Sequence, residues 1–263
     1  MSAPVLVGCS HGTDSPAGRA AIRSILDDVA RARPGLDVRE AFVDVQQPEV
    51  AVVVGELTGA PLASESRVAP LAVPDAVGSA PPHASSGADR GPADATLHAV
   101  VVPLLLSTGF HVRVDIAAAA TVEGVRAAAP LGPDARLVAI LLDRLVAAGL
   151  RPDDAVVLAA AGSTDPDAAR DVRLVAAGLS VALGRDVVVG FGAGAHPRVP
   201  VAVEKARAGL GPGGRVVVAA YLLAPGYFLD RVLEAGGDVV TDPLAPDERL
   251  AEVALDRFDA ALD

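Results

Sequence analysis

Two histidines and one aspartate follow short apolar runs that are typical of buried strands. They are His11 after the run at 5–8, Asp44 after the run at 38–43, and His111 after the run at 100–105. The carboxyl ends of parallel strands meet at one edge of a sheet, where ligands bind. Two imidazoles and a carboxylate suit Fe(II), Co(II) or Ni(II), and three protein ligands leave coordination positions open for a substrate. The pattern therefore predicts a divalent metal site, with ordinary surface histidines as the alternative.

The elements that must position these residues alternate between strand and helix. In the first half we expect strands at 5–8, 38–43 and 100–105 and helices at 14–33, 49–57 and 134–148. In the second half we expect strands at 155–160, 186–190, 215–222 and 239–240 and helices at 165–183, 199–208, 226–234 and 247–262. Asp14 is the expected N-cap of the first helix. This alternation predicts an α/β fold with parallel sheets flanked by helices.

The chain is a tandem duplication. Residues 130–149 and 243–262 are identical at 11 of 20 aligned positions. Internal repeats of this kind indicate repeated structural units. We therefore expect two halves, 1–150 with the candidate residues and 151–263 without them.

The second copy lacks the polar groups of the first. In the alignment His11 corresponds to Ala161 or Gly162, Asp44 to Ala193, and His111 to Phe228. The second copy keeps the pattern of strands and helices without these groups. This difference is expected if the groups serve a site and not the fold.

A stretch at 58–95 interrupts the first half. It holds six prolines together with serine and glycine, and it has no sustained hydrophobic period. Such composition is typical of segments that do not form a packed core. We expect a flexible insertion, and a lid over the site is the alternative.

Composition excludes several classes of protein. The chain has 263 residues and a formal net charge of −11, so no excess of basic groups is available to neutralise nucleic-acid phosphates. The only cysteine, Cys9, cannot form an internal disulfide. No apolar run reaches the ~18–20 residues of a membrane helix, and the N-terminus does not resemble a signal peptide. We expect a cytoplasmic protein that binds neither nucleic acid nor membrane, and a monomer with two pseudo-symmetric halves.

Two segments carry a family resemblance. Residues 6–13, LVGCSHGT, and residues 102–116, VPLLLSTGFHVRVDI, resemble the signatures of class II sirohydrochlorin chelatases. The resemblance spans nearly the whole chain outside the insertion. Family members insert Fe(II) or Co(II) into sirohydrochlorin on the way to sirohaem or cobalamin, and they have two chelatase-like halves.

The resemblance implies roles for particular residues. His11 and His111 would be catalytic and metal-handling, while Asp44 stands where the family commonly has a glutamate. The candidate substrate contacts are Ser10, Gly12, Thr13, Thr108, Gly109 and Arg113. The partner would be a tetrapyrrole, with Fe2+ or Co2+ as metal substrate and no permanent cofactor.

Some residues have two interpretations. Arg113 either binds a substrate carboxylate or pairs with Asp115 or another surface acid. Cys9 is a soft metal ligand or a small buried residue. Tyr221 and Tyr227 either stack on a macrocycle or pack in the core.

Two histidines outside the predicted site have weaker signals. His98 precedes the third strand of the first half and is expected to be structural. His196 follows the second strand of the second half and is a weak candidate for substrate contact.

Two other functions compete with the chelatase interpretation. A carrier of metal or tetrapyrrole with the same fold would bind without turnover. A histidine phosphatase would phosphorylate His11, but that chemistry normally needs an arginine directly before the histidine, where this chain has Ser10.

Overall fold

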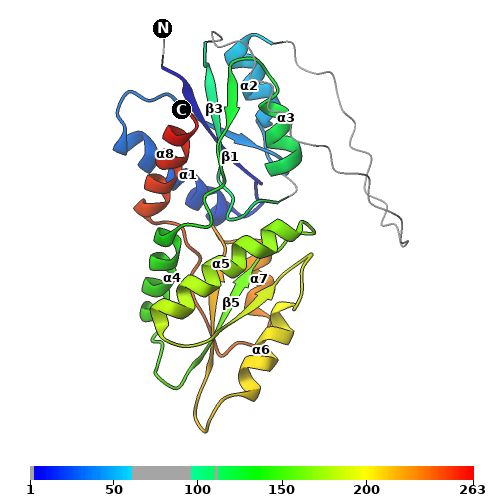
Figure 1. Cartoon of the computed structure of the whole chain (residues 1–263), viewed down its shortest axis with the longest axis vertical. Coiled ribbons are helices and arrows are strands. Elements are labelled where there is room, and N and C mark those ends of the chain that lie inside the picture. Colours follow the sequence, from blue (N-terminus) through cyan, green and yellow to red (C-terminus); the bar gives the residue numbers. More distant parts are fainter. Residues whose placement is uncertain (1–2, 61–95, 110–111) are drawn as a thin grey trace, which may run out of the picture.

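A computed structural model describes residues 3–60, 96–109 and 112–263 (Figure 1). Their strands form two parallel sheets of four, in the orders β2-β1-β3-β4 and β6-β5-β7-β8. Helices flank both sheets, so the predicted α/β class with two parallel sheets is confirmed. Most of the predicted insertion, residues 61–95, lies outside the described residues, and its flexibility stays a prediction.

The described part of the first half contains four strands. Its elements are β1 (Val5–Ser10), α1 (Pro16–Ala32), β2 (Val38–Phe42), α2 (Val50–Thr58), β3 (Ala99–Pro103), the π-helical turn η1 (Val112–Ile116), α3 (Ala117–Ala119), β4 (Val125–Ala127) and α4 (Ala135–Ala147). One expectation needs correction. Ser15, not Asp14, caps α1, because the Gly18 N–H donates to Ser15 Oγ at 3.2 Å. The segment from η1 to β4 was not predicted.

The second half repeats the pattern. Its elements are β5 (Ala155–Ala160), α5 (Pro166–Leu183), β6 (Val187–Phe191), α6 (Val199–Ala208), β7 (Val216–Tyr221), α7 (Tyr227–Leu233), β8 (Val239–Val240) and α8 (Glu248–Ala260). The predicted strand at 155–160 and the predicted helix at 199–208 match the observed elements to the residue. No helix among the described residues is long and apolar enough to span a bilayer.

Alternate residues of the central strands face two different helix layers. In β1, Leu6 belongs to an extensive core shared by both halves, whereas Val7 and Cys9 face a smaller core that includes residues of α2 and α3. This alternation is what a two-residue side-chain period requires when both faces of a sheet are covered.

The halves exchange their last helices. Helix α8 packs against α1 and β3 of the first half, and α4 packs against α5 and β7 of the second half (Figure 1). Arg144 of α4 donates to the carbonyls of Pro243, Leu244 and Pro246 in the second half. Arg257, its counterpart in α8, donates in the same way to carbonyls of 130–133 in the first half. Each sheet is therefore completed by a helix from the other repeat.

Candidate metal and substrate site

The candidate residues follow strands that end at one edge of the first sheet. In the register of this sheet Ser10 is opposite Phe42, and Cys9 is opposite Pro103. The chain leaves β1 toward β2 on one side and reaches β3 on the other side. This is the topological switch point at which open parallel sheets bind ligands.

The loop after β1 is pressed against the loop after β2. Gly12 has φ 87°, and a Cβ on it would lie 2.6 Å from the carbonyl oxygen of Asp44. The Thr13 N–H donates to Gln46 Oε1 at 2.9 Å, and the Val43 N–H donates to the Ser10 carbonyl at 3.0 Å. Only a glycine fits at position 12, because both its backbone angle and its contact exclude a side chain. The two loops thus form one surface, with the exposed His11 and Asp44 on adjacent loops.

Asp44 heads a tight turn. Its Oδ1 accepts the Val45 N–H at 2.8 Å, and its carbonyl accepts the Gln46 N–H at 2.5 Å. The described part of the chain offers this carboxylate no ion pair. Its negative charge therefore remains available at the edge of the sheet for a cation or a water molecule.

The complete predicted ligand set is not visible in the structure. His111 lies outside the described residues, and so does its predicted contribution to a metal site. Within residues 3–60, 96–109 and 112–263, no three histidine, cysteine, aspartate or glutamate side chains are grouped to hold a metal. The set of His11, His111 and Asp44 therefore stays a prediction.

Cys9 does not join the site in the described structure. Its side chain is fully buried, and burial, together with the negative charge of Asp115, raises the pKa of the thiol to about 12. A metal ligand must be a thiolate. The structure therefore favours the interpretation of Cys9 as a small core residue.

Ser10 is the buried polar residue next to His11. It is 4% exposed, and its hydroxyl has no hydrogen-bond partner in the described structure. In the second half Ala160 holds the corresponding position at the end of β5. A buried hydroxyl without a partner costs about 1–3 kcal/mol, so Ser10 is not there for stability.

The second half faces this edge on one side through an ion-pair cluster. The Thr108 N–H donates to Asp171 Oδ2 at 2.8 Å. Arg113 pairs with Asp165 at 2.6 Å and also with Asp167. Of the two interpretations of Arg113, pairing with an acid is therefore the one observed. The acids belong to the second half, and Asp115 is not among them.

A cavity of about 420 Å³ opens beside this cluster. Its walls come from both halves, namely Arg113 and Val114 of the first and 164–167 of the second. The Arg113 side chain is 51% exposed. The guanidinium is therefore partly accessible, and an anionic ligand would compete with the two aspartates for it.

The same contact occurs a second time with the halves exchanged. A Cβ on Gly18 would lie 2.4 Å from the Pro225 carbonyl, and a Cβ on Gly226 would lie 3.1 Å from Thr13 Oγ1. Pro225 and Gly226 are the counterparts of Thr108 and Gly109 in the repeat. The carboxyl edges of the two sheets therefore face each other across the junction of the halves.

The backbone donors at the start of α1 are largely used within the protein. The Ser15 N–H donates to Thr13 Oγ1, and the Gly18 N–H donates to Ser15 Oγ. Pro16 has no N–H. The Thr13 N–H is also used, so the predicted substrate contact of Thr13 would be made by its side-chain hydroxyl.

The two tyrosines differ in their environment. Tyr221 is 1% exposed, and its hydroxyl donates to the Leu106 carbonyl at 2.9 Å, so it packs in the core. Tyr227 is 68% exposed, and the Arg231 guanidinium lies 5.5 Å from its ring centre.

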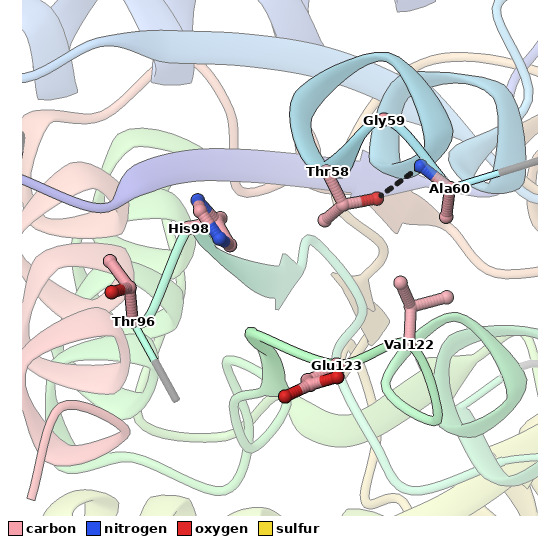
Figure 2. A pocket seen from close by; sticks show the side chains of 7 residues that line it. All are labelled: Thr58, Gly59, Ala60, Thr96, His98, Val122 and Glu123. Atoms are coloured by element: carbon pink, nitrogen blue, oxygen red, sulfur yellow. Dashed lines mark hydrogen bonds between the residues drawn. The ribbon is translucent and has the colours of Figure 1, made fainter. Parts of the chain in front are cut away.

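A second cavity, of about 290 Å³, lies at the opposite edge of the first sheet. Figure 2 shows it between the end of α2 and the segments that lead into β3 and β4, with His98 and Glu123 among its lining residues. Because His98 precedes β3, it lies at the amino edge and away from His11.

Several residues of this junction were not predicted from the sequence. The aspartates at 165, 167 and 171 lie in and around the first turns of α5, where acids are common for helix capping. Asp165 does cap α5 by accepting the Asp167 N–H at 2.9 Å. Nothing in the sequence signals that Arg113 or the Thr108 N–H also contacts these carboxylates.

The comparisons place this chain in a family. The CbiX family matches residues 77–148 and 155–261, which fall in the two halves, so the chain belongs to the CbiX family. The matched ranges include His111 and begin after His11 and Asp44. No curated protein matches the chain at a significant level of sequence similarity.

Solved structures share the fold. The chain is similar to SirB from Bacillus subtilis with Fe3+, at 17% sequence identity and a TM-score of 0.72 over 98% of this chain and 95% of that chain. It is similar to the sirohydrochlorin chelatase SirB from Bacillus subtilis subspecies spizizenii in complex with cobalt, at 16% identity and a TM-score of 0.67 over 98% and 94%. It is also similar to CbiX, described as the terminal enzyme for siroheme biosynthesis in denitrifying bacteria, at 18% identity and a TM-score of 0.60 over 98% and 100%.

Proposed function

We propose that this protein is a sirohydrochlorin chelatase, a lyase-class enzyme that inserts Fe2+ or Co2+ into sirohydrochlorin. Membership in the CbiX family supports this proposal. Two structures of similar fold, described as SirB, carry iron or cobalt in their descriptions, and one is described as a sirohydrochlorin chelatase. Metal and tetrapyrrole are both substrates here, and no permanent cofactor is needed.

The observation that carries the proposal is the asymmetry between two otherwise matching edges. The sheets have the same strand order, and the loops beyond their carboxyl ends make the same contacts twice. At the positions of His11 and Asp44 the second half has Ala161 and Ala193, and the aspartate and histidine of its own loops, Asp165 and His196, stand at other positions. One edge with a histidine and an aspartate directly after its strands, opposite an edge with alanines there, suits an enzyme that handles a single planar substrate between the halves.

The repeat also supports pairing the two histidines. In the second half, Phe228 is the counterpart of His111, and a Cβ on Gly192 would lie 3.0 Å from its ring and 3.1 Å from the Ala161 carbonyl. Ala161 is the counterpart of His11. The second half thus brings together the two positions that carry histidine in the first.

In the proposed reaction the metal replaces the pyrrolic N–H protons of the macrocycle. A neutral imidazole holds a metal ion or accepts a proton near pH 7, but one nitrogen cannot do both at once. We assign His11 and His111 to holding the ion and then accepting the released protons as the ion leaves. Asp44 contributes negative charge beside His11, either as a ligand or through a water.

Substrate binding needs positive groups, because sirohydrochlorin is a polycarboxylate and the chain has a net charge of −11. Arg113, half exposed at the junction cavity, is the proposed carboxylate contact. Ser10, Gly12, Thr13, Thr108 and Gly109 remain proposed contacts around the same edge.

The test is the rate of Fe2+ or Co2+ insertion, measured through the absorbance of sirohydrochlorin and corrected for spontaneous insertion. His11→Ala and His111→Ala should each lower turnover by about 10²–10⁴-fold, the usual worth of general acid–base assistance. Asp44→Ala should fall between these variants and the parent. His98→Ala, at the opposite edge, is the control. If the parent binds metal or sirohydrochlorin without accelerating insertion, the protein is a carrier and the proposal is wrong.

A further inference from the structure

Val45 adopts a backbone conformation that valine disfavours. Its φ is 56°, and it is the only residue other than glycine with positive φ in the described structure. The hydrogen bond from the Gln46 N–H to the Asp44 carbonyl makes it the central residue of a γ-turn. Turns of this hand are rare and strained, and β-branched residues are especially unusual there.

The second copy does without this strain. Gly194 is the counterpart of Val45, and it has nearly the same φ, 63°. Glycine adopts such angles freely. The fold therefore accepts glycine at this turn, and the valine of the first copy needs a reason other than folding.

The valine stands beside the reactive residues. Its Cβ would lie 3.2 Å from a Cβ placed on Gly12, the residue after His11. It directly follows Asp44, and the hydrogen bond from the Thr13 N–H to Gln46 Oε1 connects its turn to the loop of His11. Despite these contacts Val45 is 48% exposed. An isopropyl group is thus exposed directly after Asp44, on the turn that packs against the loop of His11.

Strained residues persist where surrounding structure holds them, and they are frequent at ligand sites. An exposed branched side chain beside two polar groups offers dispersion contact with a flat apolar surface. We propose that Val45 is a substrate-contact residue that packs against the face of the tetrapyrrole ring and sets its position relative to His11. This inference rests on the proposed substrate, but it does not require turnover.

The proposal is tested directly by measuring the binding of metal-free sirohydrochlorin through its fluorescence. Val45→Ala and Val45→Gly should each raise Kd by about 3–10-fold, because a half-buried pair of methyl groups is removed. The affinity for Co2+ without macrocycle should stay at the parent value. Val181→Ala, at an exposed valine of α5, should leave both affinities unchanged.

Thermal unfolding separates this role from a structural one. Val45→Gly should be at least as stable as Val45→Ala, because Gly194 serves the same turn in the second half. An unchanged Kd for sirohydrochlorin in both variants would overturn the proposal. If turnover were lost while this Kd stayed unchanged, Val45 would only position Asp44, and the proposal would also be wrong. If the parent shows no turnover, the chelatase function is refuted. If the two variants then still bind sirohydrochlorin more weakly than the parent, Val45 is upheld as a contact residue.

Discussion

The hydroxyl of Tyr221, at the end of β7, donates a 2.9 Å hydrogen bond to the carbonyl of Leu106 in the other half. The ring is 1% exposed, and burial raises the pKa of the phenol above its usual range. This bond fixes the segment after β3, which leads to Thr108 and Gly109. It therefore connects the core of the second half to the candidate site of the first.

Tyr221→Phe should destabilise the protein by about 1–2 kcal/mol, because the Leu106 carbonyl loses a partner inside the core. The free energy of unfolding in urea measures this loss. Tyr227→Phe, at an exposed position, should change it by less than about 0.5 kcal/mol. Equal stability of the parent and Tyr221→Phe would show that the bond does not hold the halves together.

Deleting residues 62–92 should leave the fold cooperative and turnover within about twofold. Ala60 and Thr96 line the same cavity (Figure 2), so a short glycine–serine linker can join the remaining ends. That cavity lies at the amino edge, opposite His11. A melting curve and the insertion assay check both expectations. Normal melting with lost turnover would favour the lid, and loss of cooperative melting would show that the segment is packed.

Asp154 should make stability depend on acid pH. Its side chain is 1% exposed, and the hydrogen bond from Arg215, the largest cause, lowers the pKa to about 2 from the ordinary 3.8. A depressed carboxylate pKa stabilises the fold above the unfolded-state pKa, and the contribution is lost as pH falls from about 5 toward 2. The lowered pKa corresponds to about 2 kcal/mol at neutral pH.

Asp154→Asn should therefore lower the free energy of unfolding by about 2 kcal/mol at pH 7, and the difference from the parent should shrink below pH 4. Urea titrations across this range measure it. The exposed neighbour Asp153 gives the matched control, Asp153→Asn, for which little change is expected at any pH. A difference that stays constant down to pH 2.5 would contradict the assigned ion pair.

The sequence was sufficient for elements with long, regular patterns. The apolar run of β5 and the proline-started helix α6 were predicted to the residue. Strand β4 was missed because it has three residues, of which two are exposed, so neither length nor period distinguishes it from a loop. Strands β1, β2 and β3 were predicted from apolar runs alone, although their carboxyl ends differ from the predicted ones by one or two residues.

The contacts between halves could not be predicted. An apolar stripe on α4 or α8 shows that one face of the helix packs against a sheet. Because the two halves are repeats of one pattern, the sequence does not indicate which of the two sheets that is. The partners of Arg113 were equally hidden, because a charged side chain carries no sequence signal for a distant acid. The backbone angle of Val45 was hidden too, because valine is a poor indicator of a left-handed turn.

The exchange of α4 and α8 makes its own prediction. Phe258 of α8 is 2% exposed, and Leu145, its counterpart in α4, is fully buried. Phe258→Ala and Leu145→Ala should each cost about 2–5 kcal/mol, because each leaves a cavity in the shared core. Hydrogen exchange should then locate the damage by strand.

In the observed packing, Phe258→Ala should speed exchange most in β1 and β3, although this residue is near the C-terminus. Leu145→Ala should do so in β5 and β7, because α4 covers the second sheet. If each helix instead covered the sheet of its own repeat, the two patterns would be reversed. Val146→Ala, at a 75% exposed position of α4, should leave exchange in both sheets at the parent rate.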